Sequence, residues 1–157
     1  MTDPVAPLRA RPGFMLRRAH QIAVSVFMEE TAAHGITPTQ YGILVGLQRH
    51  PGLDQISLAR LLGLDRSTVS MVLKSLEAAG LVDRVIAAPD KRRRALALTQ
   101  AGGALITALA VPATRAVERL LAPLDPAERA TFLGLLDKLT AALNEAARVP
   151  LMANPPV

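Results

Sequence analysis

Hydroxyl-bearing and basic side chains recur at helical spacing between residues 65 and 80. Positions three or four residues apart lie on the same face of a helix. One face of this stretch carries Arg66, Ser67, Ser70, Met71 and Lys74. Hydroxyls and cations can hydrogen-bond to base edges in the major groove of DNA, and methionine can contact a thymine methyl group. The spacing therefore predicts a face that reads double-stranded DNA.

Four consecutive basic residues form a second candidate contact with DNA: Lys91, Arg92, Arg93 and Arg94. A basic loop can lie along phosphates or enter the narrow, electronegative minor groove. Alone, the block would also fit an ordinary solvated loop. Its place shortly after the polar helical face favours the DNA-binding interpretation.

A helix-turn-helix unit would position the polar face. Asp65 is a good N-cap, and Gly80 can take the left-handed conformation that ends a helix. Asp54 can cap a shorter helix before it, and Gly63 lies in the tight turn between the two. The opposite side of the second helix predicts a buried stripe of Val69, Val72, Leu73 and Leu76.

The basic block lies between two runs with strand character, residues 81–86 and 95–98, and a turn at residues 87–90 precedes the cations. This pattern predicts a β-hairpin, the wing of a winged helix-turn-helix domain. Thr99 would then cap the following helix.

Two positions allow two interpretations each. Thr68 suits the DNA groove, or the first helical turn facing solvent or the core, because one position specifies little by itself. Arg84 suits a second phosphate contact, or an ion pair with Asp83 beside it on the strand.

Long helical segments flank the winged domain. Residues 14–33, 100–121 and 126–148 carry more apolar surface than one small domain needs to bury, and Pro112 should kink or interrupt the second segment. This surface predicts a two-fold homodimer with interleaved helices. Its two recognition helices would read a pseudo-palindromic operator with half-sites about 34–36 Å apart.

The predicted fold class is mainly α with a small two- or three-stranded β wing, a winged helix-turn-helix domain plus a helical dimerisation region. We expect residues 1–36 to form an N-terminal arm, irregular up to residue 13, and a dimerisation helix. Residues 37–99 would form the DNA-binding domain, residues 100–148 the C-terminal dimerisation helices and residues 149–157 a flexible tail.

Three segments together resemble the MarR family of transcription regulators: residues 62–70, 76–82 and 90–102. The resemblance extends over about residues 12–147. It implies that Asp90 and Arg92 form a structural pair in the wing, with the arginine placed to reach DNA. Met71 departs from the pattern, since many relatives carry a polar or basic residue there.

The resemblance also implies a repressor whose recognition helices change spacing when a small molecule binds between the dimer helices and the winged domain. The opening of the chain is similar to members that regulate breakdown of aromatic or cinnamate-type compounds. A small aromatic acid or its coenzyme A thioester is the expected effector. Candidate ligand contacts are Arg17, Arg18, His20 and Tyr41, which also fit ordinary surface cations and a core tyrosine.

Composition narrows the function classes. The formal net charge of +5 favours polyanionic partners, and the absence of cysteine excludes disulfides and thiolate metal sites. The isolated residues His20, His34 and His50 argue against an enzyme, and neither a cofactor nor a metal site is predicted. The uncharged stretch 95–114 contains Gly102, Gly103 and Pro112, so we predict a cytoplasmic protein without a membrane span. The alternative function is nonspecific, architectural DNA binding without ligand control.

Overall fold

The structure, a computed structural model, describes residues 5–86 and 94–152 of the chain. Its elements are α1 (Ala6–Arg9), α2 (Pro12–Glu30), η1 (Ala32–His34), α3 (Pro38–Arg49), α4 (Gln55–Leu62), α5 (Arg66–Ala78), β1 (Val82–Ile86), β2 (Arg94–Leu98), α6 (Gln100–Leu121), α7 (Pro126–Ala142) and η2 (Asn144–Ala146). The strands form one antiparallel two-stranded sheet, in which Val82 lies opposite Leu98 and Ile86 opposite Arg94. The prediction of a mainly α fold with a small β wing is confirmed.

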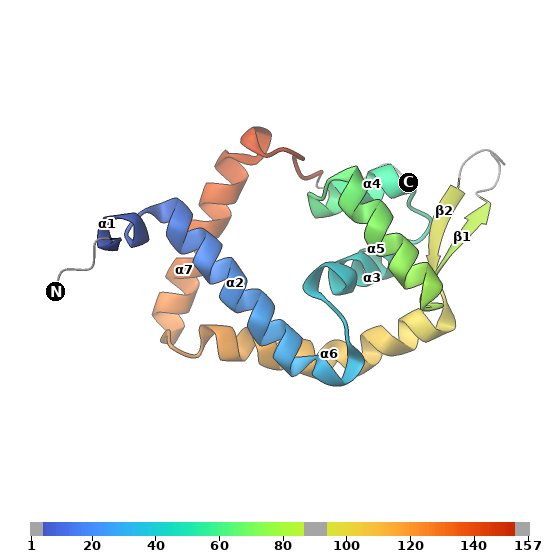
Figure 1. Cartoon of the computed structure of the whole chain (residues 1–157), viewed down its shortest axis with the longest axis horizontal. Helices are drawn as coiled ribbons and strands as arrows, with labels where there is room; N and C mark the ends of the chain where they lie inside the picture. The colour runs from blue at the N-terminus through green and yellow to red at the C-terminus, as the bar shows by residue number, and fades with distance from the viewer. Residues whose placement is uncertain (1–4, 87–93, 153–157) are drawn as a thin grey trace.

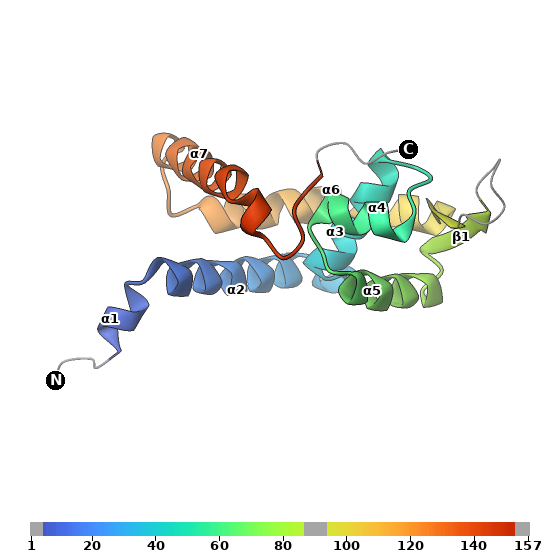
Figure 2. The same cartoon turned by 90° about the horizontal axis from the view of Figure 1, so that it is seen from above.

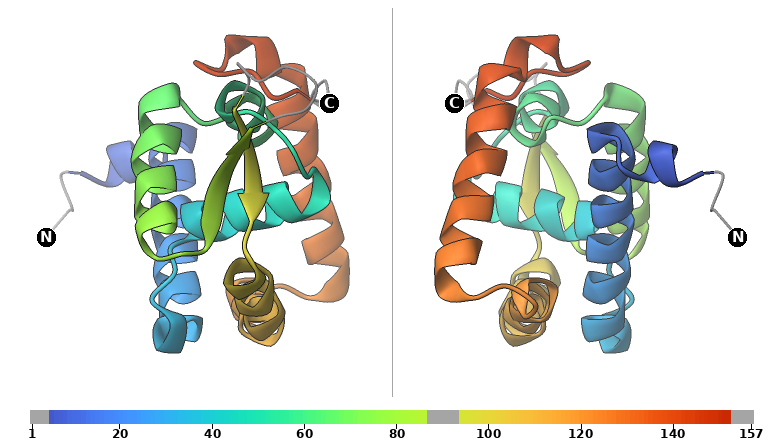
Figure 3. Two further views of the ribbon diagram at one scale, coloured as in Figure 1. Left: turned by 90° about the vertical axis from the view of Figure 1, so that its right-hand side faces the viewer. Right: turned by 90° about the vertical axis from the view of Figure 1, so that its left-hand side faces the viewer.

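The elements form two regions joined by α6. α3, α4, α5 and the hairpin gather at one end of the molecule, and α6 runs from the hairpin towards the other end (Figure 1). α2 packs along α6. Figures 2 and 3 show that α2 and α7 are two separate helices, which lie on different sides of α6. The helix-turn-helix and wing are thus held at one end of a long helical frame.

The hydrophobic core lies inside the winged region. Its fully buried side chains come from α3, α4, α5, both strands and α6, and include Ile43, Leu44, Leu47, Leu58, Val69, Leu73, Leu76, Val82, Leu96 and Leu109. The Leu96 N–H donates to the Leu53 carbonyl at 2.8 Å, so the segment before α4 runs beside β2 without forming a third strand in the described part of the chain. Burial of each leucine contributes about 2 kcal/mol of hydrophobic stabilisation.

The start of α6 is hydrogen-bonded to the turn that follows α5. The Thr99 hydroxyl donates to the Gly80 carbonyl at 2.7 Å, and its oxygen accepts from the Gly102 N–H at 3.0 Å. A Cβ added at Gly102 would lie 2.2 Å from the Leu81 carbonyl oxygen. Only glycine allows this approach, so Gly102 fixes where α6 leaves the winged region.

Side-chain caps begin α3, α4 and α7, among them the cap predicted at Asp54. Thr37 and Gln40 form a capping box at α3, and Asp125 and Glu128 form another at α7. Asp54 accepts from the Ser57 N–H at 2.8 Å at the start of α4. These side chains satisfy backbone donors that have no partner inside their helices.

Three details of the sequence prediction were wrong. The arm is not irregular throughout residues 1–13, because a short helix occupies Ala6–Arg9 and α2 already begins at Pro12, whose fixed φ suits a first helical position. Pro112 does not interrupt α6, which continues through Leu121 with one backbone hydrogen bond fewer, whereas the other predicted effect, a kink, stays a prediction. The last helix ends at Ala142 rather than near residue 148, and a 3-10 turn follows it.

Large apolar side chains remain exposed on the helical frame. On α7 they are Phe132, Leu133, Leu135 and Leu139, followed by Leu143 at its C-cap, and on α2 they include Met15, Leu16 and Ile22. Leu135 is 62% exposed, whereas the leucines of the winged core are fully buried. A single chain therefore leaves a large apolar surface uncovered. No helix within residues 5–86 and 94–152 is long and apolar enough to cross a membrane.

Candidate nucleic-acid interface

The recognition helix α5 begins at a strongly satisfied cap. The Asp65 carboxylate accepts from the Ser67 hydroxyl, from the Thr68 N–H at 2.9 Å and from the Thr68 hydroxyl at 2.8 Å. The Ser67 hydroxyl, followed by the two Thr68 donors, holds the pKa of the Asp65 carboxyl well below its usual value. A charged Asp65 thus fixes the first turn of α5.

α5 has one buried and one exposed side. Val69, Leu73 and Leu76 are buried in the core, as predicted. On the other side the polar and basic candidates lie together, with Arg66, Ser67, Met71 and Lys74 exposed and Ser70 half-buried. Met71 is 67% exposed, which is high for a methionine next to a hydrophobic core. The helix therefore presents a solvent-facing surface of cations, hydroxyls and one apolar side chain.

Thr68 lies at the edge of this surface. It is half-buried, and both its N–H and its hydroxyl donate to Asp65. This geometry favours the interpretation of Thr68 as a first-turn residue that supports the cap. A role of Thr68 in the groove stays a prediction.

The turn before α5 depends on Gly63. Its φ of +63° lies in the left-handed region, which favours glycine. The N–H of the next residue, Leu64, donates to the Ala59 carbonyl at 2.9 Å and completes the end of α4. This turn sets the angle at which α5 leaves α4.

Arg84 ties the wing to the helix-turn-helix unit. Its Nε lies 2.6 Å from Glu77 Oε1 near the end of α5, and its Nη2 lies 3.3 Å from Gln55 Oε1 at the start of α4. The predicted alternative of an ion pair with Asp83 is wrong, because neighbouring residues of a strand point to opposite faces. Sequence reasoning missed Glu77 and Gln55, since nothing local marks partners 7 and 29 residues away.

The basic block is described only in part. Arg94 is exposed at the start of β2. Asp90, Lys91, Arg92 and Arg93 lie outside the described residues, so their predicted roles stay predictions. Of the two strands that flank the block, β1 packs against α5 and β2 pairs with β1, so the hairpin lies beside the recognition helix (Figure 3).

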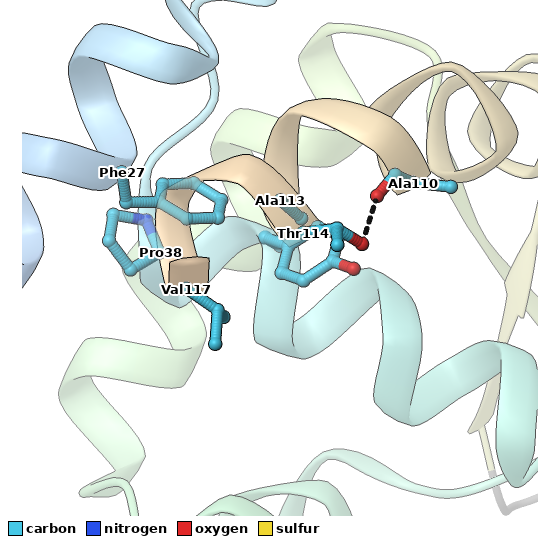
Figure 4. Close-up of a pocket in the computed structure, with 7 residues that line it drawn as sticks. Phe27, Pro38, Ala110, Ala113, Thr114 and Val117 are labelled. Atoms are coloured by element: carbon cyan, nitrogen blue, oxygen red, sulfur yellow. Dashed lines mark hydrogen bonds between the residues drawn. The ribbon is translucent and has the colours of Figure 1, made fainter. Parts of the chain in front are cut away.

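A cavity of about 390 Å³ lies between α2, α3 and α6 (Figure 4). It is lined by Phe27, Pro38, Tyr41, Ala110, Ala113, Thr114 and Val117. The rings of Phe27 and Tyr41 lie 5.4 Å apart, centroid to centroid. Its volume and largely apolar lining suit a small aromatic molecule.

Only one of the four predicted ligand contacts lines this cavity. Tyr41 does, but Arg17, Arg18 and His20 are exposed nearer the start of α2. The Arg17 guanidinium lies over the Phe14 ring, 4.9 Å from its centroid. Arg17 therefore contacts a residue of its own helix instead of the cavity. Phe27, Pro38 and Val117 line the cavity, and the sequence did not single them out.

Among the residues described, no three His, Cys, Asp or Glu side chains gather into a group that could hold a metal ion.

The chain is similar to known transcriptional regulators over most of its length. Residues 34–93 match the model of the MarR family. A protein of Thauera aromatica assigned to regulation of the hcr operon is 36% identical over 128 residues, which are 81% of this chain and 77% of that protein.

Two solved relatives share the fold. The transcriptional repressor CouR, bound to a 23-mer DNA duplex, is 29% identical with a TM-score of 0.81, and the match covers 89% of this chain and 99% of CouR. BpsR of Bordetella bronchiseptica, whose DNA binding is regulated by 6-hydroxynicotinic acid, is 26% identical with a TM-score of 0.79, covering 84% and 94%. Together with the capped recognition helix and the hairpin beside it, these similarities show that the chain belongs to the MarR family of transcriptional regulators.

Proposed function

We propose that this protein is a homodimeric repressor that binds a pseudo-palindromic DNA operator and is released by a small aromatic or acyl-type ligand. The exposed face of α5 carries the proposal. A capped, core-anchored helix that shows Arg66, Met71 and Lys74 to solvent has the shape and chemistry needed in a major groove.

Each residue of that face has a chemical role in the proposal. Arg66 and Lys74 supply cations at the two ends of the contact, and Ser67 and Ser70 supply hydroxyls between them. Met71 packs against a thymine methyl group. Arg94, with the wing residues that lie outside the described part, contacts the phosphates or the minor groove.

The uncovered apolar surface of α2 and α7 supports the proposed dimer. Residues of α2 and α7 that are exposed in one chain would be buried by the same residues of a second chain. We propose the division expected from the sequence: an arm and helix over residues 1–36, the DNA-binding domain over 37–99, dimerisation helices over 100–148 and a tail over 149–157. The start of this tail, residues 149–152, lies against the end of α4 rather than free of the domain.

The cavity is the proposed effector site. It lies between helices of the frame and α3 of the winged domain, so a ligand there would contact both regions. CouR is also known bound to p-coumaroyl-CoA, and BpsR is regulated by 6-hydroxynicotinic acid. Tyr41 and Phe27 would stack against an aromatic ring. We propose that this protein acts as a regulator rather than an enzyme, and in the cytoplasm, where bacterial operators lie.

The direct test is binding to the DNA upstream of the protein's own gene, compared with a scrambled duplex of the same composition. The proposal expects sequence-selective binding that is weakened by Lys74→Ala but not by Lys138→Ala, which removes an exposed cation from α7. Equal, steeply salt-dependent binding to both duplexes would instead establish the architectural alternative.

Release is tested with hydroxybenzoic acids, 6-hydroxynicotinic acid and p-coumaroyl-CoA added to the specific complex. Ala113→Leu should fill the cavity and abolish release while DNA binding remains. Ala108→Leu, an exposed position of α6 outside the lining, is the matched control. Release that survives Ala113→Leu would place the effector elsewhere.

A further inference from the structure

The C-terminal segment folds back onto the helix-turn-helix unit. The Met152 N–H donates to the Arg60 carbonyl at 3.1 Å, and Arg60 Nη1 lies 3.7 Å from Met152 Sδ. Arg60 belongs to the last turn of α4. Figure 1 shows the chain leaving α7 and returning towards α4, so segments 92 residues apart in sequence meet here.

Leu151, which is 54% exposed, lays one side of its side chain against the turn between α4 and α5. A Cβ placed on Gly63 would lie 3.0 Å from Leu151 Cδ2 and 3.6 Å from the Val149 carbonyl oxygen. The segment thus covers the left-handed glycine that directs the chain into the recognition helix.

The Asn144 side chain fixes the path of the segment through two hydrogen bonds to the backbone of Leu151. Its Oδ1 accepts from the Leu151 N–H at 2.9 Å, and its Nδ2 donates to the Leu151 carbonyl at 3.3 Å. Asn144 is the first residue of η2, directly after the C-cap of α7. This two-bond closure connects the end of α7 to the residue that packs on Gly63.

We propose that residues 144–152 form a strap that fixes the recognition helix relative to α7, with Asn144 and Leu151 as its positioning residues. In the described part of the chain, α7 itself makes no extensive contact with α3, α4 or α5. The strap therefore supplies the connection that packing of α7 does not. In a dimer built on α7, two straps would set the distance between the two recognition helices, and this consequence rests on the proposed function.

The first test measures the geometry inside one chain and needs neither DNA nor a dimer. The natural chain has no cysteine, so Ala78→Cys in α5 and Lys138→Cys in α7 give a unique pair of spin-label sites, both exposed. Labelled chains are diluted into excess unlabelled protein. We expect a narrow distance distribution that broadens in the Asn144→Ala/Leu151→Ala variant and stays narrow with Leu151→Met or Glu145→Gln. An unchanged distribution in the double variant would overturn the strap.

The second test uses duplexes whose half-site centres are moved apart or together by one and two base pairs. In the Asn144→Ala/Leu151→Ala variant, affinity for the duplex of best spacing should fall roughly fivefold, because the two recognition helices must then be ordered when they bind. The difference in affinity between duplexes of different spacing should also become smaller. A variant that is merely less stable would lose affinity equally at every spacing, and that result would overturn the proposal. If the wild-type protein does not distinguish operator from scrambled DNA, the proposed function fails, while the distance measurement still decides the strap.

Discussion

The side-chain amide of Gln40 joins the start of α3 to the recognition helix through Ser75. Its Oε1 accepts from the Thr37 N–H at 2.9 Å, and its Nε2 donates to Ser75 Oγ at 3.3 Å. Pro38 and Tyr41, two residues before and one residue after Gln40, both line the cavity. One side-chain hydrogen bond thus links the helix that lines the cavity to α5, and we propose that this bond carries part of a ligand's effect to the DNA-reading surface.

We expect Ser75→Ala to weaken the coupling between ligand and DNA. It removes the link and leaves the Thr37–Gln40 capping box intact. The factor by which an aromatic effector lowers DNA affinity should shrink by up to about fivefold, since one exposed hydrogen bond contributes about 1 kcal/mol or less. Titrations of the operator complex with and without effector measure this factor. Ser25→Ala, which removes a hydroxyl bonded only within α2, is the control; equal factors in both variants would refute the route.

Gly102 and Gly103 provide a matched pair for stability. Gly102→Ala would place a Cβ 2.2 Å from the Leu81 carbonyl oxygen, whereas a Cβ at Gly103 meets nothing within 4 Å. We expect Gly102→Ala to lower the free energy of unfolding by roughly 2 kcal/mol or more. Gly103→Ala should raise it by about 0.5–1 kcal/mol, because alanine is the better helix former. Urea unfolding followed by circular dichroism compares the two variants, and similar effects would contradict the close approach of α6 to Leu81, the residue before β1.

Asp65 should make the stability of the fold depend on acid pH. A carboxyl whose pKa is lowered in the folded state stabilises the fold above its unfolded pKa, and this contribution is lost as the pH falls towards the folded value. Asp65→Asn should therefore melt at a lower temperature than the wild type at neutral pH, and this difference in melting temperature should narrow steadily as the pH falls below about 4. Thermal melts across this range measure it, with Asp137→Asn on α7 as the control. A gap independent of pH would exclude a charged cap.

Arg92 is expected to contact the phosphate region from the wing. Arg92→Ala should weaken binding to every duplex and reduce the salt slope of log K by about 1, because one fewer counterion is released. Affinities at several salt concentrations give the slope. Lys138→Ala changes the net charge equally on α7 and should leave the slope unchanged. If both variants keep the wild-type affinity and slope, Arg92 does not touch DNA.

Local signals predicted the elements of the winged region. Thr37, Asp54 and Asp65 each precede a helix at the position where a side chain can satisfy free backbone donors, and each is a cap in the structure. The alternation in residues 81–86 likewise predicted a strand. Such signals act over a few residues, so they can be read without knowing the fold.

The contacts that organise the candidate site depend on folding. Arg84 pairs with Glu77, Gln40 bonds Ser75, and Leu151 packs on Gly63. These partners come from different elements, and no spacing rule connects them. The DNA-facing residues of α5 could be proposed from helical periodicity, whereas the cavity lining required α2, α3 and α6 to be brought together.

If two chains pair through the apolar side chains left uncovered on α7, as proposed, DNA binding depends on the concentration of the protein. When chains are mostly single, the concentration of pairs rises with the square of the chain concentration. Halving the protein would then cut the number of operator-competent pairs roughly fourfold. A modest change in synthesis or degradation would therefore change the fraction of free operator more steeply than it could for a protein that bound DNA as one chain.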